Sequence, residues 1–126
     1  MRYLHVFVCF ALVPLASSAV AECLKSNVEG QSAQGRLAIG RARDAAGPPE
    51  TPYILRLSAN ACLDAKNRDE IVRRARTIHI VPTDVLRRTL RHLVGKTVIV
   101  RGNPSIAYTA RHHTRIVMHV TEINAR

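Results

Sequence analysis

Residues Gly95 to Ile123 read GKTVIVRGNPSIAYTARHHTRIVMHVTEI, and this stretch decides the fold. It holds two apolar segments joined by a long polar connection. Thr97 to Arg101 is rich in β-branched residues, with Val98 and Val100 on one face. Apolar side chains also alternate in Ile116 to Thr121. The stretch therefore predicts two β-strands that close one side of a small sheet or barrel.

The connection between these two strands, Gly102 to Arg115, is the candidate functional segment. It opens on Gly-Asn-Pro, a turn signal, and is longer than a tight hairpin needs. Long loops in compact domains are often functional. Cationic, aromatic and histidine side chains gather there and can hold an anion. The predicted ligand-binding residues are Arg101, Tyr108, Arg111, His112, His113, Thr114 and Arg115.

This region resembles the domain of unknown function 4431 family of small exported bacterial domains. The shared pattern is L-x-x-L-V-G-K-x-V-x-V-x-G, then Thr, then His-His-Thr and an apolar strand. Tyr53-Ile-Leu-Arg-Leu and Cys62 resemble the family's opening half. The family often has a third histidine where this chain has Arg111, and an apolar pair where it has Asn103 and Pro104. The resemblance implies an OB-like small barrel and supplies no activity. The matching residues are Leu90, Leu93, Val94, Gly95, Lys96, Val98, Val100, Gly102, Thr109, His112, His113 and Thr114.

The first 21 residues are typical of a cleavable signal peptide. Arg2 and His5 give a weakly basic start, Val6 to Leu15 is apolar, and Ala19-Val20-Ala21 is a small-x-small cleavage site. About ten apolar residues are too few to span a bilayer, which needs ~20. We therefore predict a periplasmic or secreted protein whose residues 22–126 form one domain without a transmembrane segment.

Two cysteines remain after this cleavage, Cys23 and Cys62, because Cys9 leaves with the signal. An even pair in an oxidising compartment predicts an intramolecular disulfide. The bond would close a loop of about 40 residues and stabilise the fold by about 3–4 kcal/mol. Two free thiols or an intermolecular bridge are the alternatives.

Three earlier strands are predicted by alternation of apolar side chains. The first lies within Val28 to Arg43, where Leu37 and Ile39 are half-buried and recurrent glycines suggest bulges or coiling. Tyr53 to Leu57 and Thr77 to Val81 are the second and third strands. Ser58 to Asp69 is predicted to be a solvated loop. His79 is expected to face outward between two core isoleucines.

One helix is predicted after the third strand. Thr83 is the expected N-cap, and Leu86, Leu90 and Leu93 form an apolar stripe that Val85 and Val94 widen. Gly95 ends it. The order is strand, strand, strand, helix, strand, strand. We therefore predict an all-β protein with one helix, a five-stranded OB-fold-like Greek-key barrel. An SH3-like barrel is the alternative.

The charge of the chain predicts an anionic partner. Nineteen Lys and Arg face nine Asp and Glu, a formal net charge of +10. Genome bias would explain the preference for arginine but not the excess over acids. A cell-envelope component or an acidic protein is the expected partner. Nucleic acid is not expected, because the mature chain has few aromatic platforms for bases and carries an export signal.

Enzymatic activity is not predicted, because no serine has a recognisable nucleophile setting and no spaced carboxylate pair is present. The function alternative is a metal-binding protein or small metal-assisted hydrolase, in which His112 and His113 bind zinc or copper. Neighbouring residues of a strand point to opposite sides, so such a site needs an irregular loop. It also needs a third ligand such as His119 or His79. Otherwise no cofactor is predicted, and the oligomeric state is open.

Overall fold

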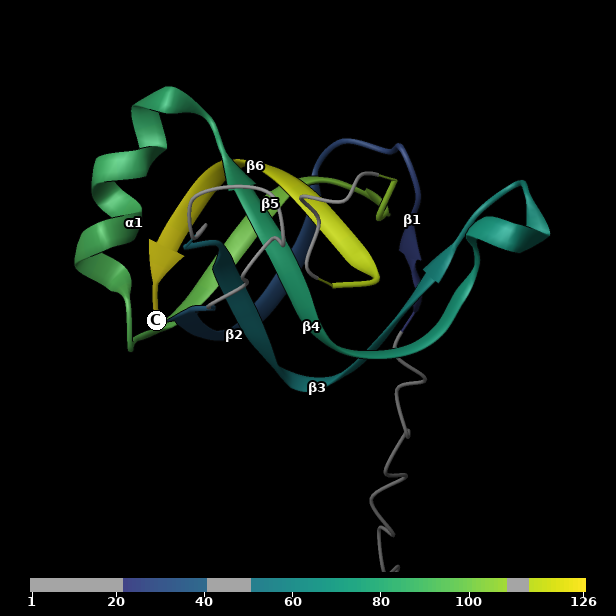
Figure 1. The fold of residues 1–126 in the computed structure, drawn as a ribbon, viewed down its shortest axis with the longest axis horizontal. Coiled ribbons are helices and arrows are strands. Elements are labelled where there is room, and N and C mark those ends of the chain that lie inside the picture. The colour runs from purple at the N-terminus through teal and green to yellow at the C-terminus, as the bar shows by residue number, and fades with distance from the viewer. Residues whose placement is uncertain (1–21, 41–50, 109–113) are drawn as a thin grey trace, which may run out of the picture.

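The computed structural model describes residues 22–40, 51–108 and 114–126. They form a closed barrel of five long strands with one short helix (Figure 1). The predicted class, mostly β with a five-stranded barrel and one helix, is confirmed. The elements in chain order are β1 (Leu24–Lys25), β2 (Gln31–Ile39), β3 (Tyr53–Asp64), the 3₁₀ turn η1 (Arg68–Glu70), β4 (Val72–Pro82), the 3₁₀ turn η2 (Asp84–Leu86), α1 (Arg87–Leu93), β5 (Thr97–Ile106) and β6 (Ile116–Ala125).

The barrel closes because every long strand pairs on both edges. The sheet runs β1-β3-β2-β5-β6-β4, and a further β3–β4 pairing joins its ends. All contacts between long strands are antiparallel except β4–β6, which is parallel. A five-stranded Greek-key barrel with this connectivity is OB-fold-like. In Figure 1 the helix covers one side, while the β3–β4 hairpin extends beyond the barrel on the other.

The core consists of the inward side chains that the alternation predicted. Ile116, Met118 and Val120 of β6 are fully buried, and so are Val98 and Val100 of β5. Burying each such side chain contributes roughly 1.5–3 kcal/mol. The barrel interior is therefore a packed apolar core rather than a binding cavity.

Two residues differ in exposure from what the direction of their side chains suggests. Ile39 is half exposed, because β2 ends there and the barrel no longer covers it. His79 lies on the outer face, between the core residues Ile78 and Ile80, yet it is only 9% exposed. Val117, its partner on β6, is also fully buried on that outer face. An outward direction on a strand therefore does not imply solvent exposure here.

The β3–β4 hairpin is longer than predicted. The expected solvated loop Ser58 to Asp69 is mostly strand, because β3 continues to Asp64 and pairs with β4 through a bulged register. The backbone finds hydrogen-bond partners on both sides, β4 on one edge and β1 on the other. Pairing with these neighbouring strands outweighs the low strand propensity of the polar residues. The sequence did not reveal it, because the partner strands are distant in the chain.

The Gly-Asn-Pro sequence does not form the predicted turn. Gly102, Asn103 and Pro104 continue β5, and the register with β6 shifts between Arg101 and Gly102. The extra residue is Thr121 of β6, so β6 bends there while β5 keeps its alternation of inward and outward side chains. Gly102 is required there, because a Cβ would lie 2.0 Å from the carbonyl oxygen of His119.

The helix is shorter than predicted. Thr83 precedes the 3₁₀ turn η2 and makes no capping hydrogen bond with its side chain. Val85 is 87% exposed, so it does not widen the apolar stripe, whereas Leu90 is fully buried. The helix ends at Leu93. Gly95 follows with φ +88°, the left-handed conformation that is common for a glycine after a helix.

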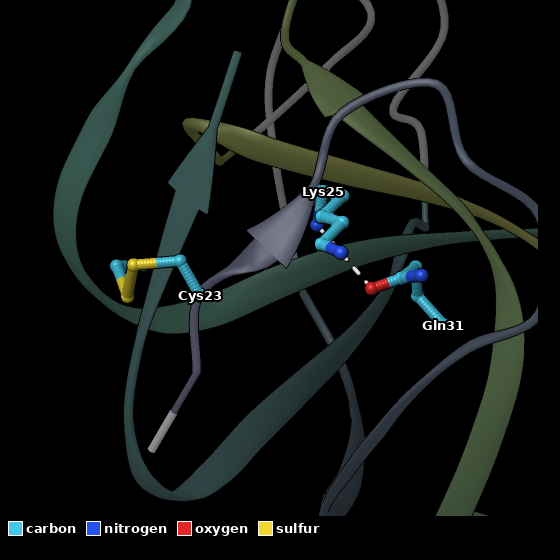
Figure 2. Close-up of a disulfide and its surroundings, with 4 residues drawn as sticks. Cys23, Lys25 and Gln31 are labelled. Carbon is cyan, nitrogen blue, oxygen red and sulfur yellow. Dashed lines mark hydrogen bonds between the residues drawn. A yellow bond between two sulfur atoms is a disulfide. The ribbon is translucent and has the colours of Figure 1, made fainter. Parts of the chain in front are cut away.

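The predicted disulfide is confirmed between Cys23 and Cys62. It joins β1 to β3, and β1 pairs in parallel with β3 at Leu24 and Leu63. Figure 2 shows the bond at one end of β1 and, at the other, the backbone N–H of Lys25 donating to the Gln31 side chain at 3.3 Å. The N-terminal segment is thereby held against the extended part of the β3–β4 hairpin.

Candidate ligand-binding surface

Two arginines lie side by side on the outer surface of the barrel. Arg36 of β2 pairs directly with Arg56 of β3, and both side chains are exposed. Like charges directly opposite each other on a sheet destabilise it. Within the described residues neither arginine has an ion-pair partner. The pair therefore concentrates positive charge that no acidic side chain in the described part of the chain neutralises.

Strand β4 extends this charge along the hairpin. Arg56 pairs with Thr77 of β4, and Arg73, Arg74 and Arg76 are exposed further along that strand, where its register with β3 shifts. With its side-chain oxygen turned towards β4, Asn60 accepts bonds from Nη2 and Nε of Arg74, each 2.9 Å long. That contact orients one guanidinium without neutralising it. We call Arg36, Arg56, Arg73, Arg74 and Arg76 the arginine strip.

Ion pairs do little to compensate the excess of cations. Nineteen Lys and Arg face nine Asp and Glu in the sequence. In the part of the chain that the structure describes, the one ion pair is Arg87 with Asp84, at 3.3 Å on the exposed start of α1. The arginine strip therefore remains available for an external anion.

Of the predicted site residues that the structure describes, Arg101 lies apart from the others. Arg101 is exposed on β5, opposite Glu122 of β6. Strand β5 ends five residues after Arg101, which is about 17 Å away at the usual rise per residue of a strand. Tyr108 lies beyond that end and is 66% exposed. Arg115 is exposed at the start of β6, and its carbonyl accepts from the backbone N–H of Ala107 at 2.9 Å.

Thr114 joins two strands. Its hydroxyl oxygen accepts from the backbone N–H of His79 at 2.8 Å, and the hydroxyl donates to the carbonyl of Ile116. The Thr114 side chain thus takes the place of a backbone hydrogen bond between β4 and β6, at the point where their parallel pairing begins. Its position is explained by the fold, without a ligand.

Replacing Thr114 by valine is expected to lower the free energy of unfolding by about 1–3 kcal/mol, because the part-buried N–H of His79 loses its acceptor. Urea unfolding measures the loss. Thr114→Ser keeps the hydroxyl and is the matched control, expected to retain most of the stability. Equal losses in both variants would contradict the bridging role.

The predicted histidine site lies outside the described residues. Arg111, His112 and His113 belong to the segment 109–113, about which the structure says nothing. Among the described residues, no group of three or more His, Cys, Asp or Glu side chains could hold a metal ion. Of the two predicted third ligands, His119 is exposed on β6 and His79 is buried on β4. Zinc or copper binding stays a prediction.

Sequence reasoning missed the arginine strip. Its residues are spread over three strands, and only the three of β4, Arg73, Arg74 and Arg76, lie close together in the sequence. The alternation that puts Leu37 and Leu55 inward does place Arg36 and Arg56 outward. The missing information was the β2–β3 register, which brings the two arginines opposite each other.

Residues 77–124 match the model of the domain of unknown function 4431 (DUF4431). The resemblance predicted from the sequence is confirmed for this segment. The DUF4431 match runs from β4 through α1 to β6, which includes the Gly102 bulge and Thr114. It does not include β2 and β3, so the resemblance of Tyr53–Leu57 to the family's opening half stays a prediction. Among curated proteins, no sequence matches this chain significantly.

A solved structure similar to this chain is the small single-stranded DNA-binding protein from Streptomyces coelicolor. The two are 19% identical, with a TM-score of 0.47, and the match covers 80% of this chain and 96% of the other. This similar structure is a single-stranded DNA-binding protein, which corrects our prediction that nucleic acid is not a partner. We therefore withdraw the exclusion of nucleic acid.

The described part of the chain contains no helix that is long and apolar enough to cross a membrane.

Proposed function

We propose that this protein is an exported, non-catalytic binding module for a phosphate-rich polyanion, which contacts the arginine strip. The observation that carries the proposal is the unneutralised pair Arg36 and Arg56, continued by the arginines of β4. Arginine suits such a partner, because its planar guanidinium binds phosphate through two parallel hydrogen bonds. The disulfide supports the exported part of the proposal, since such bonds persist in oxidising compartments.

The position of the strip also supports a ligand-binding role. OB-fold barrels bind their ligands on the face of the second and third barrel strands, which are β3 and β4 here. Arg56, Arg73, Arg74 and Arg76 lie on these two strands. Phosphate groups of a cell-envelope glycolipid and of a nucleic acid share the chemistry that this surface recognises, so the experiment must separate the two sources.

The decisive variant is the double substitution Arg36→Gln/Arg56→Gln. Its matched control is Arg88→Gln/Arg91→Gln, which removes the same charge from the exposed face of α1. The strip variant is expected to weaken binding by at least about tenfold, from charged hydrogen bonds worth about 1.5–3 kcal/mol. Binding of fluorescent single-stranded oligothymidylate and of lipopolysaccharide would be measured by anisotropy over a range of salt concentrations.

The salt dependence shows whether the strip makes the contacts. Each lost phosphate contact to a single strand lowers the slope of log K against log salt by about 0.7, so the strip variant should lose about 1.4. The α1 control should keep the slope of the unchanged protein. Equal effects of both variants would mean that binding depends on net charge alone. Preference for the oligonucleotide or for lipopolysaccharide identifies the source of the phosphate.

A further inference from the structure

A small cavity of about 260 Å³ lies on the outer surface, away from the arginine strip. The turn that follows β1, the outer face of the β5–β6 hairpin and the turn η1 surround it. Five of its lining residues matter here: Ser26, Glu70, Asn103, Ser105 and Tyr108. The volume is just below the range of drug-sized pockets, ~300–1,000 Å³, and suits one small polar ligand.

Three buried oxygen atoms at this cavity have no hydrogen-bond partner within the described part of the protein. They are Oγ of Ser26, Oδ1 of Asn103 and Oγ of Ser105. Buried polar atoms are nearly always paired, and each exception requires an explanation. Here every such atom in the described residues belongs to a residue that lines the same cavity. A bound ligand that forms hydrogen bonds with all three oxygen atoms would give each of them a partner.

The fold holds these three oxygens in place. Asn103 and Ser105 share the outer face of β5, because the strand alternates without interruption and Gly102 and Pro104 between and beside them are buried. Ser26 directly follows β1, three residues after the disulfide-bonded Cys23. Its backbone N–H donates to the carbonyl of Asp64 at 2.8 Å, and the N–H of the next residue donates to the carbonyl of Pro104 at 2.8 Å. The cavity wall is thus tied to both β3 and β5.

His119 and Asn27 also line the cavity, but the three buried unpaired atoms are oxygens, so they favour a ligand that donates hydrogen bonds. The amide oxygen of Asn103 and the carboxylate of Glu70 only accept, whereas the two serine hydroxyls can accept or donate. The described lining contains no Lys or Arg, although the chain has nineteen. This cavity therefore differs in kind from the arginine strip.

We propose that the cavity binds one neutral saccharide residue. Sugar hydroxyls donate and accept, so they match acceptors and hydroxyls placed around one small space. The exposed ring of Tyr108 at the rim offers a flat aromatic surface to the apolar face of a sugar ring. The proposal does not depend on the polyanion function, because none of the lining residues belongs to the arginine strip.

The test is an amide NMR titration of the oxidised protein with D-glucose and N-acetyl-D-glucosamine, with glycerol as the ringless control. Shifts are expected at the amides of Ser26, Asn103 and Ser105 with either sugar, and much smaller ones with glycerol. Ser105→Ala and Ser26→Ala should each weaken sugar binding by about 2- to 10-fold. Ser58→Ala, at an exposed position of β3, is the matched control and should leave it unchanged.

Stability separates a binding role from a structural one. Because the hydroxyls of Ser26 and Ser105 have no protein partner, replacing either by alanine should leave the thermal midpoint unchanged or raise it. A lowered midpoint together with unchanged sugar affinity would overturn the proposal. So would the absence of shifts around the cavity up to the solubility limit of both sugars, since the three oxygens would then bind water only. Equal shifts with glycerol would also overturn it.

Discussion

Replacing both Cys23 and Cys62 by serine is expected to lower the free energy of unfolding by about 3–4 kcal/mol. The two residues are separated by 39 positions in the chain, and the bond removes loop entropy from the unfolded state. The total stability of a domain is about 5–15 kcal/mol, so the loss is large. Denaturant unfolding of the double variant and of the parent protein measures it.

The parent protein under a reductant is the control for this prediction. It should show the same unfolding midpoint as the double serine variant, because both lack the bond. Hydrogen exchange should speed up first in β1, which pairs with β3 at only two positions, Leu24 and Lys25. Equal midpoints for oxidised and reduced protein would show that pairing with β3 alone holds the segment.

Gly102→Val is expected to destabilise the protein by about 3 kcal/mol, at the upper end for overpacking. A Cβ at this position would lie 2.0 Å from the His119 carbonyl oxygen and 2.9 Å from the Cα of Val120. Both atoms are backbone of the paired strand β6, so no side-chain movement can relieve the contact. The β5–β6 ladder would have to separate at the bulge. Urea unfolding with a constant m-value measures the loss.

Gly30→Ala is the matched comparison for this substitution. Gly30 has φ +80° but nothing lies within 4 Å of an added Cβ. Gly30→Ala should therefore lower the free energy of unfolding only by the cost of a positive φ for alanine, about 1–2 kcal/mol. If Gly102→Val lost no more than Gly30→Ala, the close approach of β5 to β6 would not matter for stability. Gly102→Val should also abolish any sugar binding, because Asn103 and Ser105 follow the bulge directly.

The strands and the disulfide were predictable because their signals are local or pairwise. Alternation identified the inward faces of β5 and β6, where Val98, Val100 and Met118 are buried. The pair of cysteines that remains once Cys9 is assigned to the predicted signal peptide was enough to predict that Cys23 bonds to Cys62. The match over residues 77–124 agrees with the resemblance based on that same region.

Other features could not be predicted, because they depend on partners distant in sequence. The Gly102-Asn103-Pro104 sequence is typical of a turn. It stays in a strand because all three residues pair with β6, and Gly102 also pairs with β2. Polar residues after Ser58 stay in β3 because β4 and β1 satisfy the backbone. Local propensity is weak compared with these hydrogen bonds.

The candidate sites divide in the same way. The net charge of +10 by itself indicated an anionic partner. The β2–β3 register decided that Arg36 lies opposite Arg56, and backbone hydrogen bonds from the turn after β1 to β3 and β5 brought Ser26 and Ser105 to one cavity. The sequence alone thus determined the barrel class, the disulfide and the sign of the charge, because each depends on composition or periodicity. Tertiary structure decided where function can lie, because strand register, bulges and closure bring together residues that no local pattern connects.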